Sequence, residues 1–169
     1  MEEISASLLE RAAEAPKAPD LTDEEKEKFF KSVLTDTPYE STVNLFDERL
    51  AITLRTMSVE ENNDVVEQIA KDKEHGSAEN SDAYFITIST YRLALCLLKV
   101  DDKDYSDVAK KTFKSADPAV SYIRARALKM REWPTFKLSA FLDAFNKFEA
   151  KVVKLTNAVQ EPNFWKASV

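Results

Sequence analysis

Few side chains in this sequence could carry out chemistry. His75 is the only histidine, so a catalytic triad or a multi-histidine metal site would depend on that one residue. Cys96 is the only cysteine, and it lies in an apolar stretch, where a free cysteine usually behaves as a small buried hydrophobe. We therefore interpret His75 as a charge that favours the end of a helix, and Cys96 as part of a core.

Acidic residues are abundant, but their spacing does not predict a catalytic pair or a cation site. Asp101, Asp102, Asp104 and Asp107 resemble a calcium loop, yet position six from Asp102 is not glycine and position twelve is Phe113 rather than glutamate. No two carboxylates form a pair within an apolar stretch, which is what raising the pKa of one of them would require. These observations favour a protein that is not an enzyme and that holds no metal or cofactor.

The composition favours a mostly helical protein. The chain has 169 residues, of which 44% are hydrophobic and 32% charged, so it can bury one sizeable core. Only glycine reaches positive φ without steric cost, and the single glycine, Gly76, is explained as a helix terminator. Phosphate-cradling loops, dinucleotide-binding turns and turn-dense all-β folds are therefore disfavoured. One cysteine cannot form an intramolecular disulfide, which fits a reducing compartment.

The charge is divided unevenly along the chain, whose net charge is −6. Residues 1–80 contain 9 basic and 20 acidic residues, a net of −11, whereas residues 81–169 contain 15 and 10, a net of +5. The acidic half makes nucleic acid an unexpected partner, because nucleic acids are bound mainly through their phosphates. A dense basic cluster, formed by Arg124, Arg126, Lys129 and Arg131, either contacts an acidic partner or is solvated surface. A nucleic-acid-associated regulatory protein that uses this basic half is the alternative function.

The chain shows no sign of a membrane location. No stretch approaches the 18 or more apolar residues of a membrane span, and the first residues are acidic, without the basic region that begins a signal peptide. We therefore expect a protein of cytosolic origin.

Three parts are expected along the chain. Residues 1–20 form an N-terminal arm, in which a marginal amphipathic helix is broken by two prolines. Residues 21–160 form a helical domain of about five to six helices, with one small β-hairpin at about 42–57, where apolar residues alternate. Residues 161–169 form a C-terminal aromatic tail.

The arm and the tail each carry apolar residues where a chain end is usually polar. Ile4 and Leu8 lie one helical turn apart, and Phe164 and Trp165 follow a helix-breaking proline. These four residues either dock on their own core or anchor a partner protein, and buried aromatic anchors carry a large share of interface energy. We include them, with the three arginines, among the candidate partner-binding residues.

Helix signals recur through the central part. Two capping boxes, Thr22 with Glu25 and Ser58 with Glu61, predict two helix starts. Further helices are expected at 82–100, from Asp117-Pro118 to Met130, and from Pro134 or Thr135 to about 158. The last helix carries a seam of apolar residues three and four apart: Leu138, Phe141, Phe145, Phe148, Val152, Leu155 and Val159. This seam either closes the core or mediates an oligomer.

The order of these features resembles the tail assembly chaperones and T4-type baseplate-hub assembly proteins of tailed bacteriophages. The resemblance covers about residues 40–165: a strand region at 46–58, a tyrosine-rich apolar helix at 84–100, a last helix at 138–159 and a terminal aromatic pair. It implies a helical, non-enzymatic protein that binds tape-measure or hub components during tail assembly in the host cytoplasm, or that stays in the baseplate of the virion. Its exact partner and copy number are left open.

Overall fold

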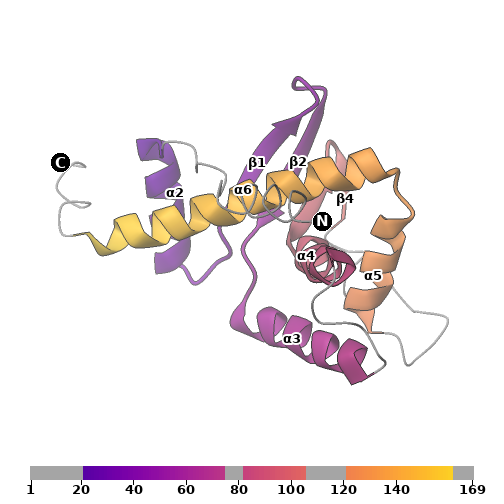
Figure 1. Cartoon of the computed structure of the whole chain (residues 1–169). Coiled ribbons are helices and arrows are strands. Elements are labelled where there is room, and N and C mark those ends of the chain that lie inside the picture. Colours follow the sequence, from indigo (N-terminus) through magenta and orange to yellow (C-terminus); the bar gives the residue numbers. More distant parts are fainter. Residues whose placement is uncertain (1–20, 75–81, 106–120, 162–169) are drawn as a thin grey trace, which may run out of the picture.

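The structure is a computed structural model that describes residues 21–74, 82–105 and 121–161. Helices account for 66% of these residues, which confirms a mostly helical protein. The described part contains five helices and a four-stranded antiparallel sheet, so the prediction of a single hairpin is wrong in extent. The elements, with the labels of Figure 1, are α2 (Asp23–Leu34), β1 (Glu40–Leu45), β2 (Leu50–Arg55), α3 (Val59–Glu74), α4 (Asp82–Cys96), β3 (Leu97–Val100), β4 (Lys103–Asp104), α5 (Tyr122–Arg131) and α6 (Thr135–Gln160).

Both predicted capping boxes are present. The Thr22 hydroxyl accepts a hydrogen bond from the Glu25 backbone N–H at 3.2 Å, and the Glu25 carboxylate accepts one from the Thr22 N–H at 3.0 Å. At the start of α3, Ser58 and Glu61 exchange the same two bonds, at 3.1 and 2.9 Å. These bonds satisfy backbone donors that a helix start leaves unpaired, which explains why α2 and α3 begin where they do. The described part of α5 begins after Ser121, whose side chain caps it, while the expected start at 117–118 lies outside the described residues.

The sheet has the order β1-β2-β3-β4. The hairpin of β1 and β2 was predicted from its alternation, but β3 was not, because residues 97–100 were assigned to the end of a helix expected to run to Val100. α4 instead ends at Cys96, and Leu97 pairs with Leu54 while Val100 pairs with Ile52. A run that is apolar on all sides fits a helix and a buried strand equally well, and pairing with β2 decides the outcome.

The acidic segment after β3 is a hairpin turn. Asp101 has a φ of 48°, a conformation that aspartate tolerates better than most residues, and residues 101–102 connect β3 to β4. Its backbone N–H donates to the Ala51 carbonyl at 2.7 Å, and its carboxylate accepts from the Ala51 N–H at 2.8 Å. Asp101 therefore ties this turn to β2. Among the described residues, no group of three or more potential ligands is placed to hold a metal ion.

The long helix α6 organises the core. It crosses the molecule and contacts α2, β1, α4 and α5 (Figure 1). The helices α3 and α5 also pack against α4. The predicted seam is confirmed as core: Phe141, Phe145, Phe148 and Leu155 are buried, and its other residues are partly buried against them. None of the described helices combines the length and the apolar character needed to cross a membrane.

Candidate functional site

An apolar groove lies between α4, α6 and the junction of β2 with α3. Its volume is about 510 Å³, within the range of roughly 300–1,000 Å³ typical of ligand-binding sites. Figure 1 shows α6 crossing over α4, with α3 beginning beside α4. Apolar side chains from all three elements line it: Val59, Cys96, Phe145, Phe148, Val152 and Val153. We call this site the apolar groove.

One edge of the apolar groove is fixed by the junction of β2 with α3. The Arg55 guanidinium donates two hydrogen bonds to the two carboxylate oxygens of Glu61, at 2.8 and 2.5 Å. Glu61 is also the partner of Ser58 in the capping box, so one buried carboxylate joins the end of the strand to the start of the helix. This arrangement sets Val59, the first residue of α3, at the rim with 80% of its surface exposed.

The opposite edge is built by α6. Phe145, Phe148 and Val152 belong to the core seam and form one side of the groove, while Val153 lies next to the seam and is 59% exposed. Val59 and Val153 are therefore exposed at the edges of the groove, whereas Phe145 and Phe148 line it but are almost completely buried. Apolar surface that stays exposed around a groove is typical of a site that another molecule covers.

The wall between α4 and α6 contains an ion pair. Arg92 Nη2 lies 2.5 Å from Glu149 Oε1, and both side chains are about one-third exposed. Burial raises the pKa of the Glu149 carboxyl, although the Arg92 charge opposes that shift. Arg92 Nε is buried and has no hydrogen-bond partner among the described residues. The wall is therefore charged but poorly solvated, and it interrupts an otherwise apolar surface.

Cys96 is buried beside this wall, as the sequence predicted. Burial raises the pKa of its thiol to about 12, so almost none of it is thiolate near neutral pH. Half of the other residues that line the groove are apolar, and the rest are polar or charged. These surroundings suit Cys96 to packing, and the groove as a whole to binding apolar surface.

The three arginines of the predicted basic cluster do not share one surface. Arg124 and Arg131 border a smaller polar pocket between α3, α4 and α5. Arg126 is only 4% exposed and donates to the Leu97 carbonyl at 2.6 Å, so it does not belong to that surface but holds α5 against β3. A step of two residues on a helix turns a side chain through about 200°, which places Arg126 opposite Arg124. Burial lowers the pKa of Arg126 to about 10.

The other candidate residues cannot be placed. Ile4, Leu8, Phe164 and Trp165 lie outside the described residues, as does His75. The apolar groove itself was missed from the sequence. Val153 gave a weak signal, as an apolar residue beside the seam rather than in it, but the facing edge of the groove comes from residues about 90 positions earlier in the chain.

The chain was also compared with known proteins. It matches no protein family model, no curated protein and no solved structure.

Proposed function

We propose that this protein is a non-enzymatic assembly factor that binds an amphipathic helix of a partner protein in the apolar groove. The observation that carries the proposal is the groove itself, about 510 Å³ in volume, with Val59 and Val153 exposed on its two rims. Two helices, α4 and α6, flank it, and a groove of this kind suits a helix that presents apolar side chains three and four residues apart.

The resemblance to tail assembly chaperones and baseplate-hub assembly proteins supports a more specific proposal. The partner is then a tape-measure or hub component of a tailed bacteriophage, met in the host cytoplasm while the tail is built. Proteins of this kind act through contacts rather than turnover, which agrees with the valine and phenylalanine side chains that line part of the groove.

The ion pair in the wall adds a requirement on the partner. Arg92 and Glu149 are both partly exposed, so a helix that lies in the groove would contact this ion pair. Covering them with purely apolar side chains would remove their remaining water, which is costly unless polar groups replace it. We therefore expect the partner helix to carry at least one polar residue among its apolar ones.

Matched variants test the proposal in infected cells. Val153→Glu places a charge on the groove rim, whereas Val66→Glu places one on α3 outside the groove, and the two valines are almost equally exposed, 59% and 58%. Tagged protein carrying Val66→Glu should recover a tape-measure or hub component, as the unchanged protein does. Val153→Glu should reduce that recovery at least tenfold, because a carboxylate would be buried against apolar surface.

Two outcomes would contradict the proposal. Equal recovery of the partner with both variants would show that the groove does not bind it. Recovery of nucleic acid without tail proteins would rule out a role in tail assembly. Salt-dependent DNA binding that is lost with Arg124→Glu and Arg131→Glu together would favour the regulatory alternative. Mass spectrometry of purified virions beside infected-cell lysate then separates a baseplate component, present in both, from a chaperone, present only in the lysate.

A further inference from the structure

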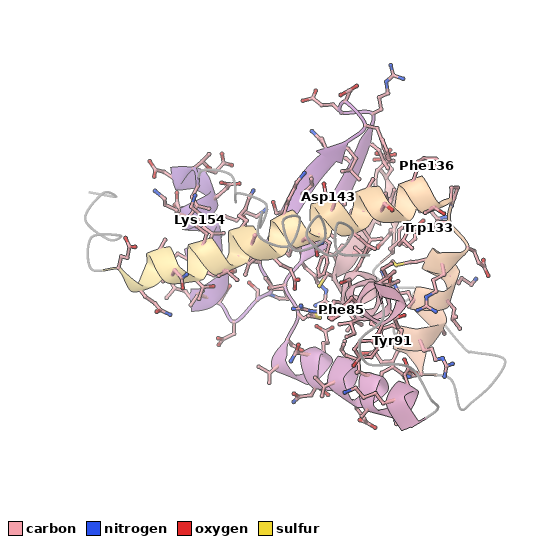
Figure 2. The ribbon with its side chains drawn as sticks, viewed as in Figure 1. Phe85, Tyr91, Trp133, Phe136, Asp143 and Lys154 are labelled. Atoms are coloured by element: carbon pink, nitrogen blue, oxygen red, sulfur yellow. The ribbon has the colours of Figure 1, made fainter. Side chains whose placement is uncertain are left out.

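A polar pocket lies between α3, α4 and α5, apart from the apolar groove. Its volume is about 190 Å³, and its polar lining comes from Asp72 on α3, Thr87 and Tyr91 on α4, and Arg124 and Arg131 on α5. Figure 2 labels Tyr91, which lies where α4 meets α3 and α5. Three helices thus bring two cations, one anion and two hydroxyl groups to one small space.

The anion of this pocket is already satisfied by neutral donors. Asp72 accepts hydrogen bonds from Gln68 Nε2 at 2.9 Å and from the Tyr91 hydroxyl at 2.5 Å, one on each carboxylate oxygen. Gln68 is bonded in turn to the Ser121 hydroxyl at the start of α5. This chain of buried polar groups fixes the floor of the pocket and leaves Asp72 little need for a cation.

The two arginines keep most of their donors unused. Arg124 and Arg131 lie seven residues apart, so they share one face of α5 about two turns from each other. The Arg124 guanidinium comes no closer than 3.8 Å to the Asp72 carboxylate, which is beyond hydrogen-bond distance. Arg131 donates to the Thr87 hydroxyl. A guanidinium carries five N–H donors, so within the described structure most of the ten donors of this pair have no acceptor.

We propose that the polar pocket binds a carboxylate from an acidic side chain of a partner protein, held between Arg124 and Arg131. Planar guanidinium groups match carboxylates in bidentate geometry. Asp72 reduces the local charge from two positive to one, which suits a monoanionic carboxylate better than a dianionic phosphate group. This inference goes beyond the proposed function and does not depend on it, because the two sites lie on different sides of α4.

The net charge of the whole chain makes the test specific. At −6, the protein as a whole repels an acidic probe, so binding at low ionic strength must come from a positively charged part of its surface. A fluorescein-labelled peptide of alternating glutamate and alanine is titrated with the full chain, and its anisotropy is measured. We expect Arg124→Gln and Arg131→Gln together to weaken binding at least tenfold.

The matched control removes two positive charges elsewhere. Lys28 and Lys31 are both exposed on α2, far along the chain from the pocket, and Lys28→Gln with Lys31→Gln changes the net charge by the same amount. This control should weaken binding less than twofold. Equal weakening by the two double variants would overturn the proposal, and so would an unchanged protein that does not bind the peptide. Circular dichroism and a thermal melt check that each variant is folded.

A third variant and two competitors test the choice of ligand. Asp72→Asn keeps an acceptor for Tyr91 and removes the opposing charge, so it should tighten peptide binding about threefold. Weaker binding with Asp72→Asn would contradict the charge argument. Inorganic phosphate or single-stranded DNA that displaces the peptide at lower concentration than free propionate, a monoanionic carboxylate, would overturn the assignment to a carboxylate.

Discussion

The apolar groove and the polar pocket are both walled by α4, yet they offer opposite surfaces. Arg92 and Cys96 point to the groove, whereas Thr87 and Tyr91 point to the pocket. Residues four apart on a helix share a face, and a step of one residue turns the face by about 100°. One helix can therefore separate a dry surface from a polar one, provided that neighbours on each side complete it.

The two sites also differ in what is left unsatisfied. In the apolar groove the unsatisfied feature is exposed apolar surface, so covering it gains free energy roughly in proportion to the area buried. In the polar pocket the buried groups are paired with one another, and the spare capacity lies in the arginine donors. Binding to the groove should therefore tolerate salt, whereas binding to the pocket should weaken as salt rises.

The largest expected effect comes from breaking the groove wall. Phe145 is 1% exposed and belongs to both the core and the groove, so Phe145→Ala should open the groove into the core. Large-to-small changes of this type cost about 3–5 kcal/mol of unfolding free energy. Urea denaturation measures the loss.

Phe136→Ala is the matched control, because Phe136 lies at the start of α6 (Figure 2) and is 70% exposed. It should cost less than about 1 kcal/mol, since little apolar area returns to water. Equal losses for the two variants would mean that Phe145 does not support the groove.

A smaller effect is expected from the polar pocket. Tyr91→Phe removes the 2.5 Å hydrogen bond to Asp72 and leaves one buried carboxylate oxygen without that donor, which should cost about 1–3 kcal/mol. Tyr122→Phe is the control, because the Tyr122 hydroxyl bonds Asp64 at a longer 3.2 Å in a part-buried position. Urea denaturation measures the unfolding free energy of both variants. An equal loss with Tyr122→Phe would contradict the special contribution of the Tyr91 hydrogen bond.

Local signals in the sequence predicted much of the fold. Both capping boxes act within three residues, and the seam of α6 repeats over seven apolar residues, so each could be read without knowing its tertiary partners. β3 could not be predicted, because Leu97–Val100 become a strand only through pairing with β2, about 45 residues earlier. The conformation of the turn between β1 and β2 could not be predicted either, because Phe46, Asp47 and Glu48 all adopt positive φ although none of them is glycine.

The candidate sites were harder to predict for the same reason. Arg124, Arg126 and Arg131 look alike in sequence, and only the packing of α5 on β3 and α4 separates the buried one from the two at the polar pocket. The apolar groove depends on facing surfaces from three elements. Composition could indicate a binding protein, but it could not indicate which surface binds.

The smallest expected effects on stability concern two glutamates, each in an ion pair that joins α6 to another helix, and the two effects have opposite signs. Burial raises the pKa of Glu149 more than Arg92 lowers it, so the folded protein holds that proton more tightly than the unfolded chain. Burial would also raise the pKa of Glu25, but hydrogen bonds from Lys151 and Thr22 outweigh it, and the folded pKa is lowered. Stability from Glu149 is therefore present at low pH and lost as pH rises through its folded pKa, whereas stability from Glu25 is present at neutral pH and lost as pH falls.

Glutamine variants should separate these signs between about pH 4 and pH 7. As pH rises, Glu149→Gln should gain unfolding free energy relative to the unchanged protein, because glutamine never has to bury a charge in the groove wall. Glu25→Gln should lose unfolding free energy over the same range, because Lys151 keeps its charge and its 2.5 Å partner becomes neutral. Urea denaturation at several pH values gives both slopes. Slopes of the same sign would show that the groove wall is better solvated than its geometry indicates, and would weaken the contrast between the apolar groove and the rest of the surface.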